Sequence, residues 1–329
     1  MRAVWYERFG PAEEVLELGE VETPAPGPGE VLVRLTFSGV NPSDAKARAG
    51  SRPGVTKPPF PRIIPHSDGA GVIEAVGEGV DRARVGERVW IWNGQWQRPF
   101  GTAAEMIALP ATQAVTLPDG VSEEVGATLG IPGLTAAQTV FGGGDISGQT
   151  LLVSGGAGSV GHNAVQLARW GGARVLATCS EHAIESVRAA GADEAFAYTD
   201  PDLAEKILEA TGGKGIDRAV EVEFGQNAEL LTQVMRPLGT VAAYGSGKDM
   251  TPTLPFGGFL FTALKIDITL IYILPEGPRI EAIGKLHAAL QAGALTPEID
   301  STMPLAACAA AQERVMTPGR AGAVLLEMG

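Results

Sequence analysis

The first part of the chain carries short apolar runs that are separated by turns. Three of them, at 31–35, 70–76 and 88–92, are rich in valine, isoleucine, leucine and tryptophan, and glycine, proline and charged residues lie around them. Apolar runs of this length, bounded by glycine or proline, predict β-strands. Several short strands in succession indicate a compact β-barrel or β-sandwich.

The pattern changes near residue 122, where stretches with helical spacing begin to alternate with apolar runs. Ser122 is a plausible N-cap, because two glutamates follow it. Farther along we expect strands at 151–153, 174–178, 217–222 and 240–244, and helices at 162–170, 184–190, 202–211 and 228–235. This order predicts an α/β fold with a parallel sheet and right-handed crossovers. A helix at 305–316 and a strand at 323–326 end the chain.

The charge balance argues against nucleic acid and membrane surfaces as partners. The 329 residues include 25 Lys and Arg and 38 Asp and Glu, which gives a net charge of −13. Such a chain repels phosphate backbones and anionic membranes. The longest apolar stretch, 256–274, contains Lys265 and Asp267, so we interpret it as buried strand and loop and not as a membrane span. The N-terminus lacks the apolar core of a signal peptide, and we expect a cytoplasmic protein.

A glycine-rich loop joins the expected strand at 151–153 to the helix that follows. Residues 155–161 read Gly-Gly-Ala-Gly-Ser-Val-Gly. Small residues at this place let backbone amides approach a pyrophosphate at the positive end of the helix. The predicted cofactor contacts are Gly156, Ala157, Gly158, Ser159 and Val160. The alternative is a tight turn that binds nothing.

The end of the strand at 174–178 bears on the choice of coenzyme. A carboxylate there would bind the ribose 2′-hydroxyl and exclude a 2′-phosphate. The chain has Cys179 and Ser180 instead, so we expect NADPH with Ser180 among its contacts. Glu181 follows immediately, and no lysine or arginine lies beside it, which argues the other way. His182 is a weak candidate for a phosphate ligand, because an exposed loop histidine is the simpler interpretation.

Several motifs along the chain occur in the order of a known family. They lie at 38–44, 65–77, 85–89 and 133–137, and the glycine-rich loop follows them. With these motifs the chain resembles the zinc-independent quinone oxidoreductases (zeta-crystallin-like) of the medium-chain dehydrogenase/reductase superfamily. The likeness covers nearly the whole chain.

The resemblance implies a domain organisation, a cofactor and an assembly. It implies a discontinuous GroES-like catalytic domain, 1–122 and 266–329, and a Rossmann nucleotide-binding domain, 123–265. It also implies hydride transfer from NADPH, and a homodimer.

The same resemblance argues against a catalytic zinc ion. In related zinc alcohol dehydrogenases the metal is held by Cys, His and Cys, and the matching positions here are Asn41, Ser67 and Pro132. None of these residues is a good zinc ligand. His66 lies next to Ser67, but only carboxylates are near it in the motifs, so we expect no metal. The two cysteines of the chain also cannot build a four-thiolate site.

The resemblance implies roles for three residues near the coenzyme. It places Asn41 beside the nicotinamide, where its amide can donate a hydrogen bond, although an asparagine before a proline is also a common turn residue. Thr135 would contact the nicotinamide side. Tyr198 matches a family tyrosine near the adenosine phosphate, and packing at a strand end is the alternative.

Other candidate residues come from their positions in the pattern. Gly245 and Ser246 follow the strand at 240–244, and the carboxyl ends of such strands face the ligand crevice. Lys46 stands where many relatives carry tyrosine; it could donate a proton or attract an anionic substrate, or it could be a solvated helix lysine. The candidate substrate contacts are Asp44, Trp92 and Trp96, and core packing is an equal alternative for the tryptophans. Glu221 and Glu223 lie two residues apart, on one face of the expected strand, where paired carboxylates could share acid–base work. Nothing else supports that role, and because 223–225 falls where relatives carry a loop near the cofactor, we interpret it as architectural.

Taken together, these features predict an NADPH-dependent, zinc-free reductase of quinones or other α,β-unsaturated carbonyl compounds. Without a metal, hydride transfer to an electron-poor carbon or a quinone oxygen needs only hydrogen-bond donors for the developing oxyanion. An enoyl or 2-alkenal double-bond reductase on the same fold is the alternative. A cofactor-binding protein without turnover and a nucleic-acid binder are the rivals from other classes, and the net charge argues against the second.

Overall fold

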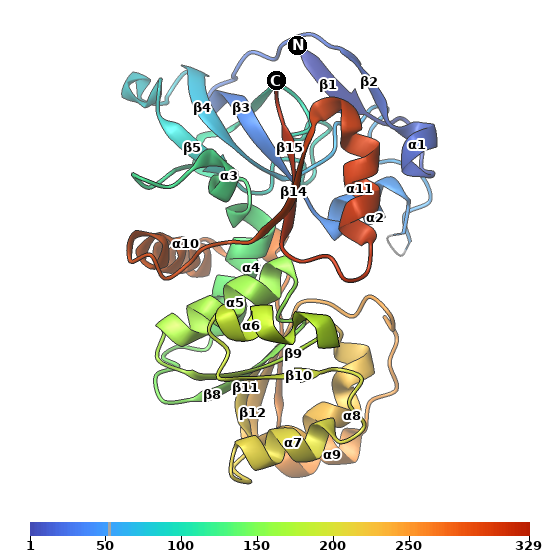
Figure 1. Cartoon of the computed structure of the whole chain (residues 1–329). Helices are drawn as coiled ribbons and strands as arrows, with labels where there is room; N and C mark the ends of the chain where they lie inside the picture. Colours follow the sequence, from blue (N-terminus) through green and yellow to red (C-terminus); the bar gives the residue numbers. More distant parts are fainter. Residues whose placement is uncertain (52–53) are drawn as a thin grey trace. The chain divides into compact units, whose positions relative to one another are not determined.

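The computed structural model describes residues 1–51 and 54–329 and divides into two compact units (Figure 1). Met1–Ile131 and Pro297–Gly329 form the first unit, and Pro132–Thr296 forms the second. The first unit is therefore discontinuous in sequence, with residues 132–296 between its two segments. Helix α10 (Glu276–Gln291) packs against α4 (Leu134–Phe141), which keeps the segment before Pro297 with the second unit.

The first unit is built on a mainly antiparallel sheet. In the described residues this sheet has seven strands, in the order β14-β15-β3-β4-β5-β7, with β6 paired to β3. The strands are β3 (Glu30–Val40), β4 (Asp68–Val76), β5 (Arg88–Ile91), β6 (Met106–Pro110), β7 (Ala114–Thr116), β14 (Ile299–Pro304) and β15 (Ala323–Glu327). The three strands expected in this part and the closing strand are confirmed. A separate ribbon pairs β1 (Arg2–Trp5) with β2 (Glu17–Glu20).

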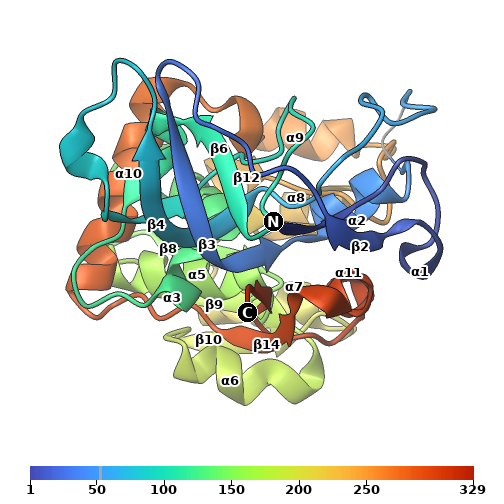
Figure 2. The same cartoon turned by 90° about the horizontal axis from the view of Figure 1, so that it is seen from above.

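Short helices accompany this sheet. They are α1 (Ala12–Val15), α2 (Pro42–Arg48), α3 (Glu123–Gly126) and α11 (Cys308–Met316). The predicted cap of α3 is confirmed, because the Ser122 hydroxyl accepts a hydrogen bond from the Val125 N–H. Helix α11 packs on α1 and α2, as Figure 2 shows from above. The C-terminal segment is thereby fixed next to the helix that begins after Asn41.

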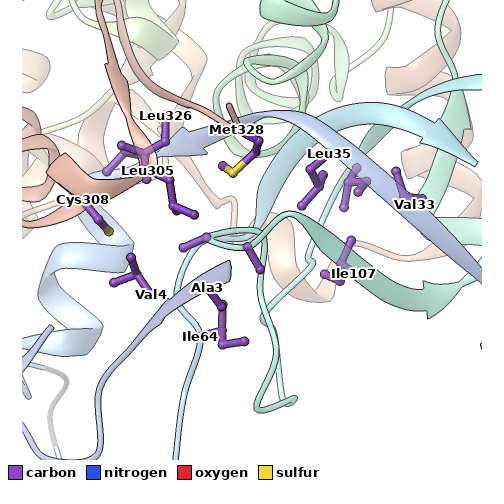
Figure 3. Packing of buried hydrophobic residues seen from close by; sticks show 14 of the residues in the cluster. Ala3, Val4, Val33, Leu35, Ile64, Ile107, Leu305, Cys308, Leu326 and Met328 are labelled. Atoms are coloured by element: carbon purple, nitrogen blue, oxygen red, sulfur yellow. The ribbon is translucent and has the colours of Figure 1, made fainter. Parts of the chain in front are cut away.

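The core of the first unit draws on both ends of the chain. Figure 3 shows side chains from β1, β3 and β6 facing side chains from the C-terminal segment. Among those that it labels are Ala3, Val4, Val33, Leu35, Ile64, Ile107, Leu305, Cys308, Leu326 and Met328. Burying apolar side chains of this kind stabilises a fold by about 1.5–3 kcal/mol for each large one.

The second unit contains a parallel sheet with the strand order β10-β9-β8-β11-β12-β13. Its strands are β8 (Thr150–Ser154), β9 (Arg174–Cys179), β10 (Glu194–Ala197), β11 (Ile216–Glu221), β12 (Met235–Ala243) and β13 (Lys265–Ile268). Every pairing between these neighbours is parallel. The predicted parallel sheet is therefore confirmed, and this order is typical of a Rossmann-type fold.

Helices cover the two faces of this sheet (Figure 1). They include α4, α5 (Ser159–Trp170), α6 (Ile184–Ala189), α7 (Leu203–Ala210), α8 (Phe224–Val234), α9 (Phe256–Thr262) and α10. Leu203 and Ile207 of α7 and Leu231 and Val234 of α8 pack with the sheet residue Leu152 in one buried cluster. All parallel strands end at one edge, so the loops that follow β8, β9, β11 and β12 lie along the same edge.

The stretch 256–274 is not the buried strand and loop that we expected. Its first part is helix α9, and its second part is the edge strand β13. Phe261 is 88% exposed and Ile268 is 78% exposed, so much of its apolar surface lies outside the core. The prediction was wrong because a run of apolar residues does not show whether other parts of the chain cover their side chains. In the described part of the chain no helix has both the length and the apolar character that a membrane crossing needs.

Candidate functional site

The loop between β8 and α5 is a tight turn that depends on its glycines. Gly155 has φ +70°, the left-handed region that favours glycine. A Cβ atom on Gly161 would lie 2.1 Å from the Gly155 carbonyl oxygen, so no larger residue fits there. The Gly156 N–H donates to the Thr178 carbonyl oxygen at 2.9 Å and ties the loop to β9.

The predicted pyrophosphate contacts lie on this loop, at the amino end of α5. Gly158 is the N-cap residue, and within the residues described no side chain caps the helix. The first N–H groups of an α-helix have no acceptor inside the helix, and its dipole places partial positive charge there. The turn and the helix end together fit the pyrophosphate of a dinucleotide. The structure brings the five predicted residues to this place: Gly156, Ala157, Gly158, Ser159 and Val160.

The ends of β9 and β10 lie side by side at the same edge. The Tyr198 N–H donates to the Cys179 carbonyl oxygen at 2.9 Å, which places Tyr198 beside Ser180. The Tyr198 side chain is 55% exposed, and the Lys248 ammonium lies 5.9 Å from the centre of its ring. Lys248 was not predicted as a site residue, because it comes from the loop after β12, far from Tyr198 in the chain. No local sequence signal could have revealed this contact.

The loops after β11 and β12 are tied to each other. The Gly225 N–H donates to the Ser246 hydroxyl at 2.9 Å, and the Phe224 N–H donates to the Gly245 carbonyl oxygen at 3.1 Å. The Lys248 N–H donates to the Glu223 carboxylate at 3.0 Å. Gly245 and Ser246 therefore lie at the predicted edge of the sheet, in a loop whose backbone is fixed.

Glu221 ends β11 as a buried acid. Its carboxylate accepts from the Asn227 side-chain amide at 3.0 Å, and the same amide lies 3.2 Å from the Ser154 hydroxyl. Burial raises the pKa of Glu221 above its usual value, while the hydrogen bonds that its carboxylate accepts from the Glu223 N–H, Asn227 and Ser154 act in the opposite direction. The Glu221 carboxylate thus ties the end of β11 to α8, which carries Asn227.

Helix α4 carries Thr135 and also lines a cavity. Thr135 is buried, and its carbonyl oxygen accepts from the Thr139 hydroxyl at 2.7 Å. The cavity, of about 520 Å³, opens between α4, the end of α5 and α10, where Phe141, Trp170 and Lys285 are among its lining residues. None of the predicted site residues lines it. The chemistry of the candidate site therefore lies in the loops, away from this cavity.

In the first unit, Asn41 is held in a defined orientation. It is the N-cap residue of α2, and its backbone N–H donates to the Asp44 carboxylate at 2.8 Å. Its side-chain Nδ2 donates to Asp68 Oδ2, also at 2.8 Å. The turn interpretation and the functional interpretation of Asn41 are thus compatible, because its backbone caps α2 while its amide group is oriented by Asp68.

Asp68, which the sequence analysis did not single out as a partner of Asn41, is a buried carboxyl group. Besides the Asn41 amide, it accepts the Ile131 N–H at 2.9 Å. Burial raises the pKa of Asp68 well above its usual value, and the nearby Asp44 adds to this, while the Ile131 and Asn41 hydrogen bonds lower it. Asp68 thus holds its proton more tightly than an exposed carboxyl group does, and it lies directly behind the Asn41 amide.

A chain of buried hydrogen bonds lies behind Asp68. The Arg48 Nε donates to Gln312 Oε1 at 3.0 Å, which turns the Gln312 Nε2 toward His66 Nε2 at 3.1 Å. His66 must then carry its proton on Nδ1, which faces the Ser38 hydroxyl at 3.1 Å. Burial lowers the pKa of His66 to about 3, so the ring is neutral. His66 is therefore a structural residue with both ring nitrogens occupied.

The chain continues from Ser38 to the backbone of Asp68. The Ser38 hydroxyl lies 2.8 Å from the Thr102 hydroxyl, which donates to the Asp68 carbonyl oxygen at 2.6 Å. This network fixes the start of β4, where the Asp68 side chain leaves the backbone.

The remaining candidates differ in their exposure. Lys46 is exposed on α2, and Asp44 is buried beside Asn41. Trp92 is buried, and its Nε1–H donates to the Thr112 carbonyl oxygen at 3.2 Å. Trp96 is half-buried in the turn that follows. Asp44 and Trp92 are thus buried, whereas Lys46 is exposed and Trp96 keeps part of its surface exposed.

Two family models match the chain in the order that the fold requires. The alcohol dehydrogenase GroES-like domain matches residues 27–119, and the zinc-binding dehydrogenase model matches residues 159–277. The expected pair of a GroES-like domain and a Rossmann-type sheet is thereby confirmed.

Relatives match over nearly the full length. Quinone oxidoreductase of Rattus norvegicus is 31% identical over 99% of this chain and 97% of its own. A 2-haloacrylate reductase of Burkholderia sp. is also 31% identical, over 99% of this chain and 98% of its own.

Two solved structures agree with the fold over all or nearly all of both chains. An NAD-dependent alcohol dehydrogenase superposes with a TM-score of 0.88 at 30% identity, covering 100% of each chain. A mycobacterial protein complexed with NADPH superposes with a TM-score of 0.87 at 26% identity, covering 99% of this chain and 100% of that one.

The residues at the positions of a catalytic zinc site do not fit that metal. Asn41, Ser67 and Pro132 offer neither a thiolate nor an imidazole, and the Asn41 amide already donates to Asp68. Both ring nitrogens of the neighbouring His66 are engaged. In residues 1–51 and 54–329 no group of three or more His, Cys, Asp or Glu side chains is arranged to hold a metal ion.

Proposed function

Because the chain belongs to the quinone oxidoreductase-like family of the medium-chain dehydrogenase/reductase superfamily, we propose that it is an NADPH-dependent reductase of quinones or other α,β-unsaturated carbonyl compounds. The observation that carries this proposal is the glycine turn at the amino end of α5, where Gly155 has a positive φ and Gly161 admits no Cβ. The NADPH-bound mycobacterial structure of the same fold supports the coenzyme.

In the proposed complex, three places on the second unit bind the coenzyme. The glycine turn binds the pyrophosphate through backbone N–H groups. Ser180 and Tyr198 bind the adenosine half, and Thr135, Gly245 and Ser246 lie toward the nicotinamide half. Bound NADPH supplies the hydride that the reaction consumes. The chain itself supplies position, hydrogen bonds and the exclusion of water.

Asn41 is the proposed donor to the oxygen that gains charge during hydride transfer. A side-chain amide has two N–H groups, and one of those of Asn41 donates to Asp68 at 2.8 Å. The second is then directed by the first, so the donor is oriented before a ligand arrives. Preorganised donors of this kind stabilise a developing enolate or quinol oxyanion.

Lys46 and Trp96 are the proposed residues on the substrate side. Lys46 is exposed and could deliver a proton or attract an anionic substrate, and the half-buried Trp96 offers a flat apolar face. The proposal that Asp44 and Trp92 touch substrate has less support, because each is buried and bonded to the protein.

Reduction of an activated carbon–carbon double bond is the second candidate function. It is favoured by the Burkholderia relative, a 2-haloacrylate reductase that is 31% identical over nearly the full length. We would compare rates with 1,4-benzoquinone, 9,10-phenanthrenequinone, a 2-alkenal and 2-chloroacrylate, and identify each product. A higher kcat/KM for the quinones supports the main proposal, and a higher value for either alkene promotes the second.

We also propose that the protein is a homodimer that pairs through β13. This strand bonds to β12 on one side, and in the described residues no strand lies on its other side. Two isoleucines of this strand, Ile266 and Ile268, have exposed apolar side chains. An apolar, unpaired edge is prone to pair with another strand, and a second copy offers an identical edge.

The cytoplasmic location stays a prediction, which a fluorescent fusion would test.

A further inference from the structure

The loop after β9 does not provide the charge that a 2′-phosphate requires. Ser180, Glu181 and His182 follow the strand, and they offer a hydroxyl, a carboxylate and an imidazole. Recognition of a ribose 2′-phosphate usually involves a basic side chain near this strand end. If the coenzyme is NADPH, the cation must therefore come from another part of the fold.

Lys248 is the basic residue that the fold brings to this place. Its ammonium group lies 5.9 Å from the centre of the Tyr198 ring, and the Tyr198 backbone is bonded to Cys179 beside Ser180. Lys248 is exposed, and in the part of the chain that the structure describes it forms no ion pair. The nearby Arg188 of α6 differs, because it already pairs with Glu185 at 3.2 Å.

The backbone that carries Lys248 is held firmly. The Lys248 N–H donates to Glu223 at 3.0 Å, and the neighbouring Ser246 hydroxyl accepts the Gly225 N–H at 2.9 Å. Only the flexible stem of the lysine is free to move. Its weak contact with the Tyr198 ring is readily exchanged for a stronger, charge-assisted bond to a phosphate.

We propose that Lys248 determines the specificity for NADPH by binding the 2′-phosphate of the adenosine ribose, together with Ser180 and Tyr198. The inference rests on the proposed function, because it assumes that the site binds a dinucleotide. The ribose of NADH carries a neutral hydroxyl at this position, so Lys248 contributes to the binding of NADPH alone.

The test is a comparison of NADPH and NADH dissociation constants, measured by titration of nicotinamide fluorescence, for the wild type and Lys248→Met. We expect the substitution to weaken NADPH binding by about tenfold and to change NADH binding by less than about twofold, as for the loss of one charge-assisted hydrogen bond. The NADPH affinity of the wild type should fall with salt more steeply than that of the variant.

Lys214→Met is the matched control. Lys214 is also exposed but precedes β11, so it lies at the amino edge of the same sheet, opposite the coenzyme loops. The control removes the same charge and should leave both dissociation constants unchanged. An equal loss of NADPH affinity in both variants would overturn the proposal, since it would reflect net charge alone.

Two further outcomes separate a failure of this inference from a failure of the proposed coenzyme. A wild type that prefers NADPH, with the preference intact in Lys248→Met, overturns the role of Lys248 and leaves the coenzyme choice standing. Loss of the preference in Arg188→Met instead would assign the cation to α6. A wild type that binds both coenzymes equally overturns the role of Lys248 and the choice of NADPH together.

Discussion

At the scale of single residues, the account rests on the contact between Asn41 and Asp68. The carboxylate takes one amide hydrogen of Asn41 and is itself fixed by the Ile131 N–H and, through its backbone, by Thr102. An amide that was free to rotate would lose conformational entropy on binding a ligand. The Asn41 amide has already lost that freedom in the folded protein, which suits a hydrogen-bond donor in catalysis.

Asn41→Ala tests the proposed donor. We expect kcat/KM for a quinone to fall by about a hundredfold, as when one donor to an oxyanion is removed, with little change in NADPH affinity. Steady-state kinetics beside a coenzyme titration measures both quantities. A variant that keeps the full rate would show that Asn41 serves only the turn before α2.

Asp68→Asn tests the buried carboxyl through the pH dependence of stability. Burial raises the pKa of Asp68 in the folded state, so the folded protein binds this proton more tightly than the unfolded chain does. The contribution of Asp68 to stability is therefore fully present below the unfolded pKa of about 3.9 and is lost as the pH rises toward the folded pKa.

The amide of Asp68→Asn does not ionise, so the variant does not lose this contribution to stability as the pH rises. Urea unfolding at pH 4.5 and at pH 8 should show the variant gaining stability relative to the wild type at the higher pH. The same relative stability at both values would mean that Asp68 does not titrate in this range.

At the scale of elements, the turn from β8 to α5 is the part that most directly serves the proposed coenzyme. Its shape depends on two glycines. Gly155 has a positive φ, and the Gly155 carbonyl oxygen lies so close to Gly161 that a side chain at 161 would not fit. The helix that follows has glycine at its cap position, so a bound anion meets the backbone directly.

Gly161→Ala should distort this turn, because the new Cβ would lie 2.1 Å from the Gly155 carbonyl oxygen. We expect NADPH affinity to fall by at least tenfold and the protein to lose about 1–3 kcal/mol of stability, as for overpacking. Gly284→Ala is the control, since Gly284 lies on α10 and a Cβ there would meet nothing within 4 Å. Equal effects of the two substitutions on NADPH binding would contradict this view of the turn.

Some helices and strands could be predicted from the sequence, and others could not. The strand, the glycine turn and the helix after it were predictable, because strand patterning, turn chemistry and helix spacing are local properties. The strand β10 was missed, since Glu194–Ala197 has only four residues and two of them are alanines, which do not favour a strand. The contacts of Asn41 with Asp68 and of Lys248 with Tyr198 form only when the chain folds. The spacing of these residues in the sequence does not predict them.

At the scale of the whole molecule, the free edge of the parallel sheet is the most informative surface. The apolar run at 256–274 was interpreted as core, yet Phe261 and Ile268 are exposed. Exposed apolar groups beside an unpaired strand favour association, and our proposal of a homodimer explains why a chain would keep them at its surface.

Ile268→Glu tests this explanation. A charge placed on the edge strand should repel its copy across a symmetric interface and shift the protein from dimer to monomer, as measured by light scattering after size-exclusion chromatography. Ile280→Glu is the control, because Ile280 is similarly exposed but lies on α10. A wild type that is monomeric at micromolar concentration would contradict the proposed interface.

The initial rate of NADPH oxidation at 340 nm with 1,4-benzoquinone, measured before and after treatment with a chelator, tests the proposed zinc-free reductase most directly. We expect turnover that needs the acceptor, exceeds the rate with NADH and survives chelation. Turnover that is lost on chelation and restored by zinc would contradict the zinc-free mechanism. Tight NADPH binding without oxidation by any quinone or activated alkene would contradict the assignment as a reductase.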